Sequence, residues 1–568
     1  MRDSVINISV SCFNASVNVC TRVVLIILSA SVYQAFVIVE VLINNSHVWY
    51  PPVITVLASK IQKRTSYVKN YALKVLAIKV VMMNGFMRRF LRFLVSLLAI
   101  VVRPLTYVLN LKRNKKCPPP TNPILYKSAT TLAMMIRNKQ ITSEEVVAAY
   151  IERCKEVNPY LNAVVEPRYN MALKEARCID KMIASNDRTP EQLAKEYPLL
   201  GLPMTVKESI AVEGMSNDSG TVYPHRNPAK KDAEIVRLAR AAGAIPIAVT
   251  NTPQHCMNWE TYNNVTGLTM NPYDQKRTAG GSSGGESALI ASAASIMGVG
   301  SDIAGSLRLP PMFNGIFGHK PTPRLLSVEG HIPDSLDPEF EEYFALGPIT
   351  RYAEDIPLLL NVLRQSSGPD VPLDKPLKIK NIEHMWEISV RVLFNIQHVR
   401  NIYTDPKKRD QWVSVWPEVL KKMIGLSNHS FTSVAYGPVK KFFDALPRGY
   451  YNNLVNVFEG IKSDFGEALS DDAVLFFPAF PYPANLHYRI FYRFLNCGYL
   501  TIFNALGLPV TACPLGLTDQ GMPVGIQIVA NKCNDHLTIA VAKEFEKAFG
   551  GWVPPNKDVL CSIKTTLT

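Results

Sequence analysis

Residues 278–311 combine a high density of glycine with several hydroxyl groups. The segment reads TAGGSSGGESALIASAASIMGVGSDIAGSLRLPP, with four glycines and two serines at residues 280–285. After an apolar run it continues with Asp302, Ser306 and Arg308. A serine hydroxyl can act as a nucleophile when a base is placed beside it, and a glycine-rich loop can bind phosphate through backbone N–H groups. The segment therefore indicates either nucleophilic catalysis or phosphate binding.

The glycine-rich part fits known loop types only incompletely. A phosphate-binding loop of the G-x-x-x-x-G-K-[ST] type needs a lysine after its last glycine, whereas Gly285 is followed by Glu286. A nucleophile elbow, G-x-S-x-G, is matched formally by residues 280–284, but it needs a preceding strand, and residues 271–279 read as a charged turn. A flexible linker is a third alternative, but the alanine-rich run at 286–296 predicts a buried helix instead.

Two further motifs distinguish among these alternatives. Lys207 lies 75 residues before Ser282 in GLPMTVKES, and Ser306 lies 24 residues after Ser282 in GVGSDIAGSLRLP. Together with the glycine-rich loop, this composite pattern resembles the amidase signature family. Further matches extend over residues 128–365 and 477–552 and include NALGLPVTACPLGL and GMPVGIQIVA. The motifs GIFGHKP, GPITRYAEDIPLL and NDHLTIAVAKEFEKAFGGW look like those of the membrane-associated fatty-acid amide hydrolases of the second type.

The resemblance implies that a serine, a cis-serine and a lysine are the catalytic residues. Carried over to this sequence, it makes Ser306 the nucleophile, Ser282 the bridging serine with a cis peptide bond, and Lys207 the base. Lysine can act as a base only when it is neutral, so burial or a cationic neighbour must lower its pKa. Lys207 ends an apolar run, which suits burial, although the adjacent Glu208 also allows a surface ion pair.

The resemblance also implies supporting groups around the nucleophile. The oxyanion hole is expected to consist of backbone N–H groups, those of Ile303, Ala304, Gly305 and Ser306. Ser283 is expected to form a hydrogen bond within the site, and Asp302 and Arg308 an ion pair that holds the loop. Gly281 and Gly284 are expected to give the backbone the freedom to bend. An ordinary loop salt bridge is the alternative for the ion pair.

One position departs from the family pattern. Most members have a glycine where this chain has Ala304. If that position needs a positive φ, an alanine there costs roughly 1–2 kcal/mol and displaces a donor. The stretch after Asp374 is also shorter than we expect for these enzymes. For Ala304, a reduced activity and a tolerated methyl group are the two alternatives, whereas the shorter stretch bears on the fold of that region and on stability.

The sequence around these residues predicts alternating strands and helices. Residues 199–206 and 244–249 are short apolar runs typical of strands, and residues 232–242 between them have helical spacing. This order is typical of an α/β fold. The resemblance makes it the amidase signature fold, a large mixed twisted sheet covered by helices, expected here over residues 128–555 and followed by a tail at 556–568.

The catalytic domain is expected to begin after a proline-rich junction at residues 116–127. A helix start follows, because Thr142 can cap a helix and Glu145 can complete a capping box. Ile141 and Val146 can add a hydrophobic staple. The first helices of the domain are therefore expected from this point.

The net positive charge of the chain is confined to its N-terminal part. Residues 1–120 hold 16 Lys and Arg against two acidic residues, whereas the remainder holds 45 of each kind. The main body is thus neutral, which argues against a nucleic-acid partner. The basic arm instead favours an anionic membrane surface as partner.

Two apolar stretches lie within this helical arm at residues 1–115. Residues 23–43 carry one charge and are long enough to span a bilayer as a helix, whereas residues 90–102 are shorter and typical of an interfacial segment. We therefore expect a single N-terminal anchor and a location on intracellular membranes. Three methionines precede the second stretch, so a gene-model extension over residues 1–81 stays an alternative.

These observations predict a membrane-associated serine hydrolase that cleaves fatty-acid primary amides or N-acylethanolamines. The ten cysteines are scattered without ligand spacing, so we expect no metal and no cofactor. An amidase or esterase for small soluble substrates is one alternative, and a catalytically degenerate lipid-binding member is another. The arm argues against a glutamine amidotransferase subunit, which shares the signature. A homodimer is left open.

Overall fold

The computed structural model describes most of the chain that follows the predicted arm. It covers residues 99–364 and 415–556, apart from short gaps at 101, 112, 114, 186–187, 226, 336, 338, 445–447, 470–472 and 491–492. The predicted apolar segment at 23–43, most of the segment at 90–102 and the stretch after Asp374 up to residue 414 lie outside the described residues. Within the described ranges, no helix is both long enough and apolar enough to cross a bilayer.

A nine-stranded mixed sheet organises the described part of the chain. Its strand order is β1-β3-β2-β6-β8-β7-β10-β11-β9. Strand β2 runs parallel to β3 and β6, and the other neighbours are antiparallel. The bounds are β1 (Val164–Pro167), β2 (Pro203–Lys207), β3 (Ile245–Thr250), β6 (Met297–Asp302), β7 (Phe317–Lys320), β8 (Ala345–Thr350), β9 (Val474–Pro478), β10 (Val510–Leu517) and β11 (Pro523–Ala530), with a separate pair β4 (Tyr262–Asn263) and β5 (Gly267–Leu268). The predicted mixed sheet is confirmed.

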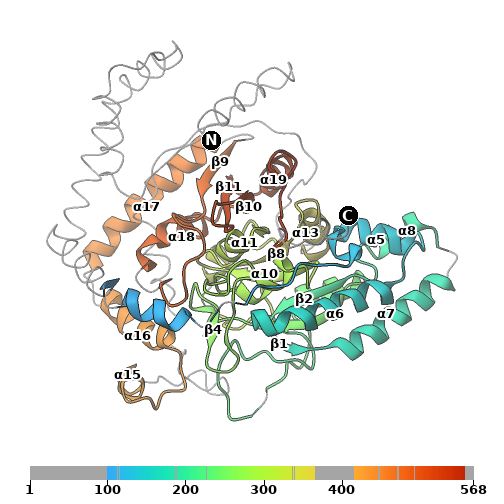
Figure 1. The fold of residues 1–568 in the computed structure, drawn as a ribbon. Helices are drawn as coiled ribbons and strands as arrows, with labels where there is room; N and C mark the ends of the chain where they lie inside the picture. The colour runs from blue at the N-terminus through green and yellow to red at the C-terminus, as the bar shows by residue number, and fades with distance from the viewer. Residues whose placement is uncertain are drawn as a thin grey trace, which may run out of the picture.

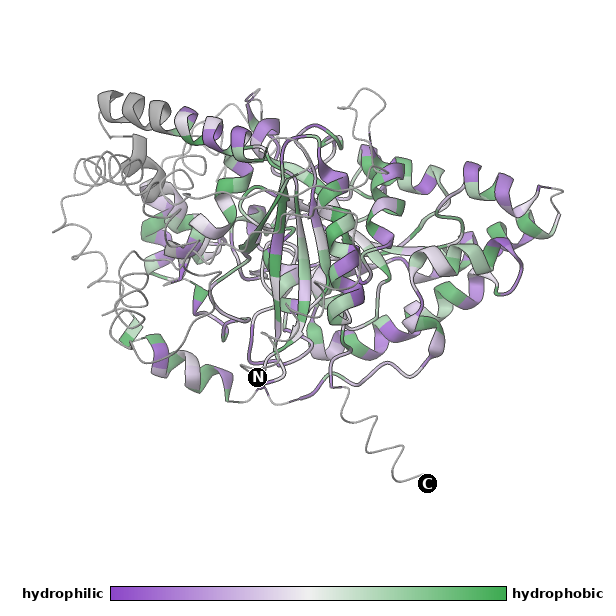
Figure 2. Ribbon diagram, turned by 90° about the horizontal axis from the view of Figure 1, so that it is seen from above, coloured by the Kyte–Doolittle hydropathy of each residue, from purple (hydrophilic) through white to green (hydrophobic). Residues whose placement is uncertain are grey.

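Helices cover this sheet (Figure 1). Seen from above, they flank the strands on both sides and carry alternating bands of hydrophobic and hydrophilic residues (Figure 2), as expected for elements that bury one face. The α-helices are α5 (Ala129–Arg137), α6 (Ser143–Leu161), α7 (Tyr169–Ala184), α8 (Pro190–Glu196), α9 (Glu234–Ala241), α10 (Gly284–Ala291), α11 (Leu309–Asn314), α12 (Phe340–Tyr343), α13 (Asp355–Leu363), α15 (Val415–Met423), α16 (Phe431–Asp444), α17 (Arg448–Ala468), α18 (Gly498–Ala505) and α19 (Asp535–Phe549). The described ranges also contain the 3-10 helices η2 (Pro123–Tyr126), η3 (Gln254–Cys256) and η7 (Phe494–Cys497).

The predicted helices and strands are present in the structure, although some of their first and last residues differ. Strands β2 and β3 and helix α9 lie where the apolar runs and the helical spacing predict them. Helix α6 begins with the predicted capping box, in which Thr142 and Glu145 satisfy each other's backbone N–H groups. The helix predicted at 286–296 instead ends at residue 291, because Ala293 adopts a left-handed φ of 63° and the chain turns into β6.

The proline-rich junction packs against the sheet-and-helix body. The buried guanidinium of Arg153, from α6, donates to the carbonyl oxygens of Pro118 and Pro119 and to that of Ser292, which follows α10. One cation therefore fixes the junction and the end of α10 to the same helix.

Two large apolar clusters form the core. The larger one lies between the sheet and helices such as α5, α6, α9 and α13. The second brings together residues of α11, α18, β9 and the loop that carries Ala304. The predicted nucleophile loop thus lies at the edge of an apolar cluster.

Candidate active site

Lys207 ends strand β2 and is fully buried, as the apolar run before it predicts. Its Nζ donates to Ser282 Oγ at 2.6 Å and to Ser301 Oγ at 2.8 Å. Burial lowers the pKa of Lys207, because the charged form loses its hydration. The alternative of a surface ion pair with Glu208 is wrong, since Glu208 is itself buried and accepts hydrogen bonds from residues 216, 218 and 220.

The two predicted catalytic serines lie beside each other. The peptide bond between Gly281 and Ser282 is cis, as predicted. The backbone N–H of Ser282 donates to Ser306 Oγ at 2.9 Å, and both serines are buried. The structure therefore brings Lys207, Ser282 and Ser306 together from three separate segments of the chain.

Two of the predicted glycines are required by close backbone approach. A Cβ added to Gly281 would lie 2.4 Å from the carbonyl oxygen of Asn258, and one added to Gly284 would lie 2.3 Å from Thr261 Oγ1. Both distances are far below van der Waals contact. The glycine-rich loop therefore packs directly against the segment of chain that precedes β4.

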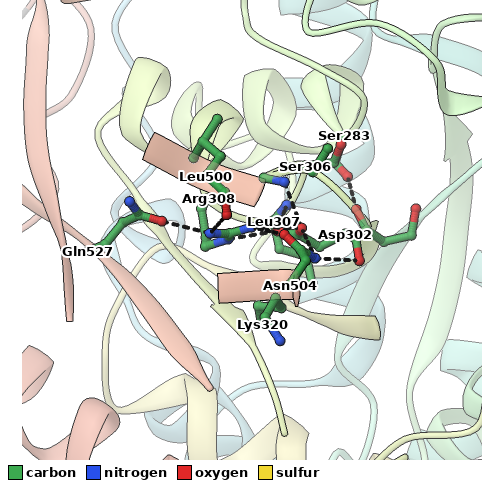
Figure 3. Close-up of polar contacts among 12 residues, drawn as sticks. Ser283, Asp302, Ser306, Leu307, Arg308, Lys320, Leu500, Asn504 and Gln527 are labelled. Atoms are coloured by element: carbon green, nitrogen blue, oxygen red, sulfur yellow. Dashed lines mark hydrogen bonds and ion pairs between the residues drawn. The ribbon is translucent and has the colours of Figure 1, made fainter. Parts of the chain in front are cut away.

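Asp302 and Arg308 form the predicted ion pair, and it is buried (Figure 3). Arg308 Nε lies 2.9 Å from Asp302 Oδ2, and both side chains have no exposed surface. The guanidinium also donates to Leu500 O, Gln527 Oε1 and Asn504 Oδ1. Burial raises the pKa of Asp302, but the charge of Arg308 and the hydrogen bonds that the carboxylate accepts from Arg308 and Asn504 hold it well below its usual range. An ordinary loop salt bridge is therefore excluded for this pair.

The Asp302 carboxylate also fixes the backbone of the loop that carries Ser306. It accepts from Gly305 N at 2.7 Å and from Leu307 N at 3.0 Å. The prediction that Gly305 contributes to an oxyanion hole is thereby corrected, because its N–H group already donates to Asp302. Asp302 does not engage the N–H groups of Ile303, Ala304 and Ser306, which stay the candidate donors.

Ala304 is accommodated without backbone strain. The left-handed conformation of this loop falls on the following residue, Gly305, with a φ of 104°, and Ala304 is not among the residues with positive φ. Its carbonyl oxygen accepts a hydrogen bond from Trp259 Nε1 at 2.9 Å, and its side chain is buried in the second apolar cluster. The expected strain at this departure from the family pattern is therefore wrong.

The remaining supporting residue, Ser283, has a marginal contact. Its Oγ lies 3.5 Å from the carbonyl oxygen of Ser301, at the outer limit of a hydrogen bond. Its side chain is buried beside the ion pair, as the close-up shows (Figure 3).

Sequence reasoning missed several polar residues next to Lys207. Ser301 contacts its amine directly, and Cys256 and His331 lie just beyond. A signal for Ser301 was present, because it lies near the carboxyl end of β6, the parallel neighbour of β2, and such ends meet at one edge of a sheet. Among the described residues, no group of three or more His, Cys, Asp or Glu side chains could hold a metal ion.

Comparison with known proteins agrees with this fold. The family model named Amidase matches residues 145–392 and 375–539. The chain therefore belongs to the amidase signature family and is an amide hydrolase.

Among its relatives are two fatty-acid amide hydrolases. The chain is 37% identical over 495 residues to fatty-acid amide hydrolase 2-B of Danio rerio, an alignment that covers 78% of this chain and 93% of the relative. It is 35% identical over 520 residues to fatty-acid amide hydrolase 2 of Homo sapiens, which covers 82% and 97%. Among solved structures, native peptide amidase from Stenotrophomonas maltophilia shares the fold, with a TM-score of 0.59 at 19% identity over 76% of this chain and 99% of that one.

The loop geometry predicts that one of two neighbouring substitutions impairs hydrolysis and the other does not. Gly305→Ala places a Cβ within 2.6 Å of the Leu500 side chain at a left-handed φ, so we expect a loss of at least about tenfold in amide hydrolysis, from roughly 1–2 kcal/mol of backbone strain plus the clash. Ala304→Gly relieves no strain, so activity should stay within about threefold. Hydrolysis rates and thermal unfolding of both variants check this. A gain of activity in Ala304→Gly would show that the alanine impairs the loop.

Proposed function

We propose that the chain is a membrane-associated serine hydrolase that cleaves fatty-acid amides through an acyl-enzyme on Ser306. The observation that carries this proposal is the buried Lys207 amine, hydrogen-bonded to Ser282 Oγ, with the Ser282 N–H group on Ser306 Oγ. This arrangement supplies a base, a bridging hydroxyl and a nucleophile in sequence.

The reaction begins with proton transfer. Neutral Lys207 accepts the Ser282 hydroxyl proton while Ser282 Oγ accepts the proton of Ser306, whose oxygen attacks the amide carbon. Because burial lowers the pKa of Lys207, a larger fraction of the amine is neutral near pH 7 than in water. The negative charge of the tetrahedral intermediate is stabilised by N–H groups of residues 303, 304 and 306.

The intermediate collapses when the C–N bond breaks. Ser282 then donates a proton to the leaving amine, and Lys207 returns a proton to Ser282, which leaves an ester between the acyl group and Ser306. Water attacks this ester with the same groups acting as base, and the carboxylic acid leaves. Each group ends the cycle in its starting protonation state.

The substrate class follows from the relatives and from the surroundings of Ser306. Relatives that cover most of this chain are named fatty-acid amide hydrolases. The apolar cluster beside Ser306 includes Ala304, Trp259, Phe480 and Leu500, side chains that suit a long alkyl chain. Primary amides and N-acylethanolamines of long-chain acids are therefore the proposed substrates.

Membrane association is supported by two exposed apolar surfaces. On α15, the turn after it and the first residue of α16, six large apolar side chains are 55 to 78% exposed: Trp416, Leu420, Met423, Ile424, Leu426 and Phe431. Lys421 and Lys422 lie among them. The helical residues 102–110 expose Leu105, Tyr107, Val108 and Leu109. Clusters of exposed apolar side chains beside lysines are typical of surfaces that enter a bilayer interface.

Active-site labelling tests the catalytic residues. We expect a long-chain fluorophosphonate to label the detergent-solubilised wild type at Ser306, and Ser306→Ala to abolish the labelling. Ser282→Ala and Lys207→Met should slow it by at least about 100-fold, the usual range for loss of a general base. Ser287→Ala is the matched control, because the Ser287 hydroxyl in α10 is buried and has no hydrogen-bond partner within the described part of the chain. Absence of labelling in a folded wild type would contradict the proposal.

Chain-length dependence tests the substrate class. Each methylene that becomes buried contributes about 0.8 kcal/mol, or roughly fourfold in kcat/KM. We therefore expect hexadecanamide to be hydrolysed at least about 100-fold more efficiently than butanamide in the same detergent. Equal efficiencies would instead favour an amidase for small soluble substrates.

Depth-dependent fluorescence tests the membrane surface on α15. Trp416 is 55% exposed, so in vesicles containing brominated lipids we expect part of the tryptophan emission to be quenched through this residue. Trp416→Phe should remove that part, and vesicles of unbrominated lipid provide the control. If quenching by brominated lipids is the same fraction of emission in both proteins, α15 does not enter the bilayer. The readout does not depend on catalysis or on any other anchor.

A further inference from the structure

A cluster of polar residues surrounds the Lys207 amine on the side away from the predicted nucleophile. Ser301 Oγ accepts from Lys207 Nζ and lies 3.1 Å from His331 Nε2, and Ser209 Oγ lies 3.0 Å from the same nitrogen. His331 Nδ1 lies 2.9 Å from the Pro333 carbonyl oxygen, which can only accept, so Nδ1 carries a proton. The neutral ring therefore accepts at Nε2, and Ser301 can donate to it.

Cys256 completes this cluster from the 3-10 turn η3. Its Sγ lies 3.5 Å from Thr252 Oγ1, 3.8 Å from Ser219 Oγ and 4.0 Å from His331 Nε2. The thiol also lies close enough to Lys207 for the charge of each group to shift the pKa of the other. The proposed mechanism makes no use of this half-buried thiol, although it belongs to the cluster around the proposed base.

The backbone that presents Cys256 is strained. His255 and Cys256 adopt left-handed φ values of 53° and 59° in succession. Such a conformation costs a residue with a side chain roughly 1–2 kcal/mol, and it persists only where the surroundings enforce it. The strain indicates that the surrounding contacts hold the Cys256 side chain in its position near Lys207.

We propose that Cys256 is a positioning residue for Lys207: the thiol and the amine share one proton, so that Cys256 sets the pH range in which Lys207 acts as a neutral base. The inference rests on the role of Lys207 in the proposed function. The pair has zero net charge either as amine with thiol or as ammonium with thiolate. A buried site tolerates both states better than a lone charge.

The other charged groups around Lys207 are already compensated. Asp302 is paired with Arg308. Burial raises the pKa of Glu286 to about 8, so its carboxyl group is mostly protonated at neutral pH. His331 reaches the amine only through Ser301. Cys256 is therefore the acid that can balance an ammonium at Lys207. Burial raises the pKa of its thiol, but a positive charge at Lys207 and the contact with His331 together hold that pKa well below the usual range.

The pH dependence of kcat/KM for a long-chain amide provides the first test. The rate rises with pH as Lys207 loses its proton. Cys256→Ser removes the anionic partner, so the ammonium is less stable and the acidic limb should move about one pH unit lower. Cys256→Asp supplies a stronger anion and should move it about one unit higher. Cys533→Ser, at a half-buried cysteine outside this cluster, should leave the acidic limb where it is in the wild type. Shifts that are absent, or equal in sign for both Cys256 variants, would overturn the proposal.

Thiol alkylation provides a second test that needs no hydrolysis. The protein is treated with iodoacetamide at pH 7, and the rate at Cys256 is followed by mass spectrometry. If the proton is shared, Lys207→Met should slow this rate by roughly tenfold, because the thiolate fraction falls. Buried Cys154 must stay unmodified, which shows that the variant is folded. An unchanged rate at Cys256 in such a folded variant would overturn proton sharing. A chain that hydrolyses no amide but passes this test would contradict only the proposed function.

Discussion

The buried ion pair between Asp302 and Arg308 is the interaction on which the site depends. Two charges without exposed surface carry a desolvation penalty of several kcal/mol each, and only complete hydrogen bonding offsets it. The structure provides this, since Arg308 reaches α18 at Leu500 and Asn504 and β11 at Gln527. One guanidinium therefore ties the loop after β6 to two elements that lie 192 to 219 residues further along the sequence.

The same pair determines which backbone groups are left for chemistry. Asp302 takes the N–H groups of Gly305 and Leu307 and forces the chain to turn between them, with the left-handed conformation at Gly305. Ser306 lies between these two anchored residues. The backbone of Ser306 is thus held by the contacts of Asp302 with its two neighbours, and its hydroxyl accepts a hydrogen bond from the Ser282 N–H group. Such fixed geometry favours a nucleophile, because little reorganisation is needed when the substrate binds.

The sequence predicts the parts of the site that local motifs encode. Lys207, Ser282, Ser306 and the cis bond belong to a composite pattern, and the start of α6 follows from Thr142 and Glu145 alone. The use of the Gly305 N–H group by Asp302 could not be predicted, because it depends on the sign of one φ angle. The position of Cys256 and His331 near Lys207 could not be predicted either, because segments far apart in the sequence must come together around Ser301, which contacts the amine.

The surface proposed to meet the membrane and the turn that carries Cys256 are connected by hydrogen bonds. Gln254, the first residue of η3, accepts from the backbone N–H of Ser430 at 2.6 Å, and its amide nitrogen lies 2.7 Å from His429 Nδ1. Both partners follow directly on the exposed turn after α15. Cys256 lies two residues beyond Gln254 in the same strained turn. Because a left-handed turn holds its shape only through such contacts, the α15–α16 segment helps to maintain the geometry around the proposed base.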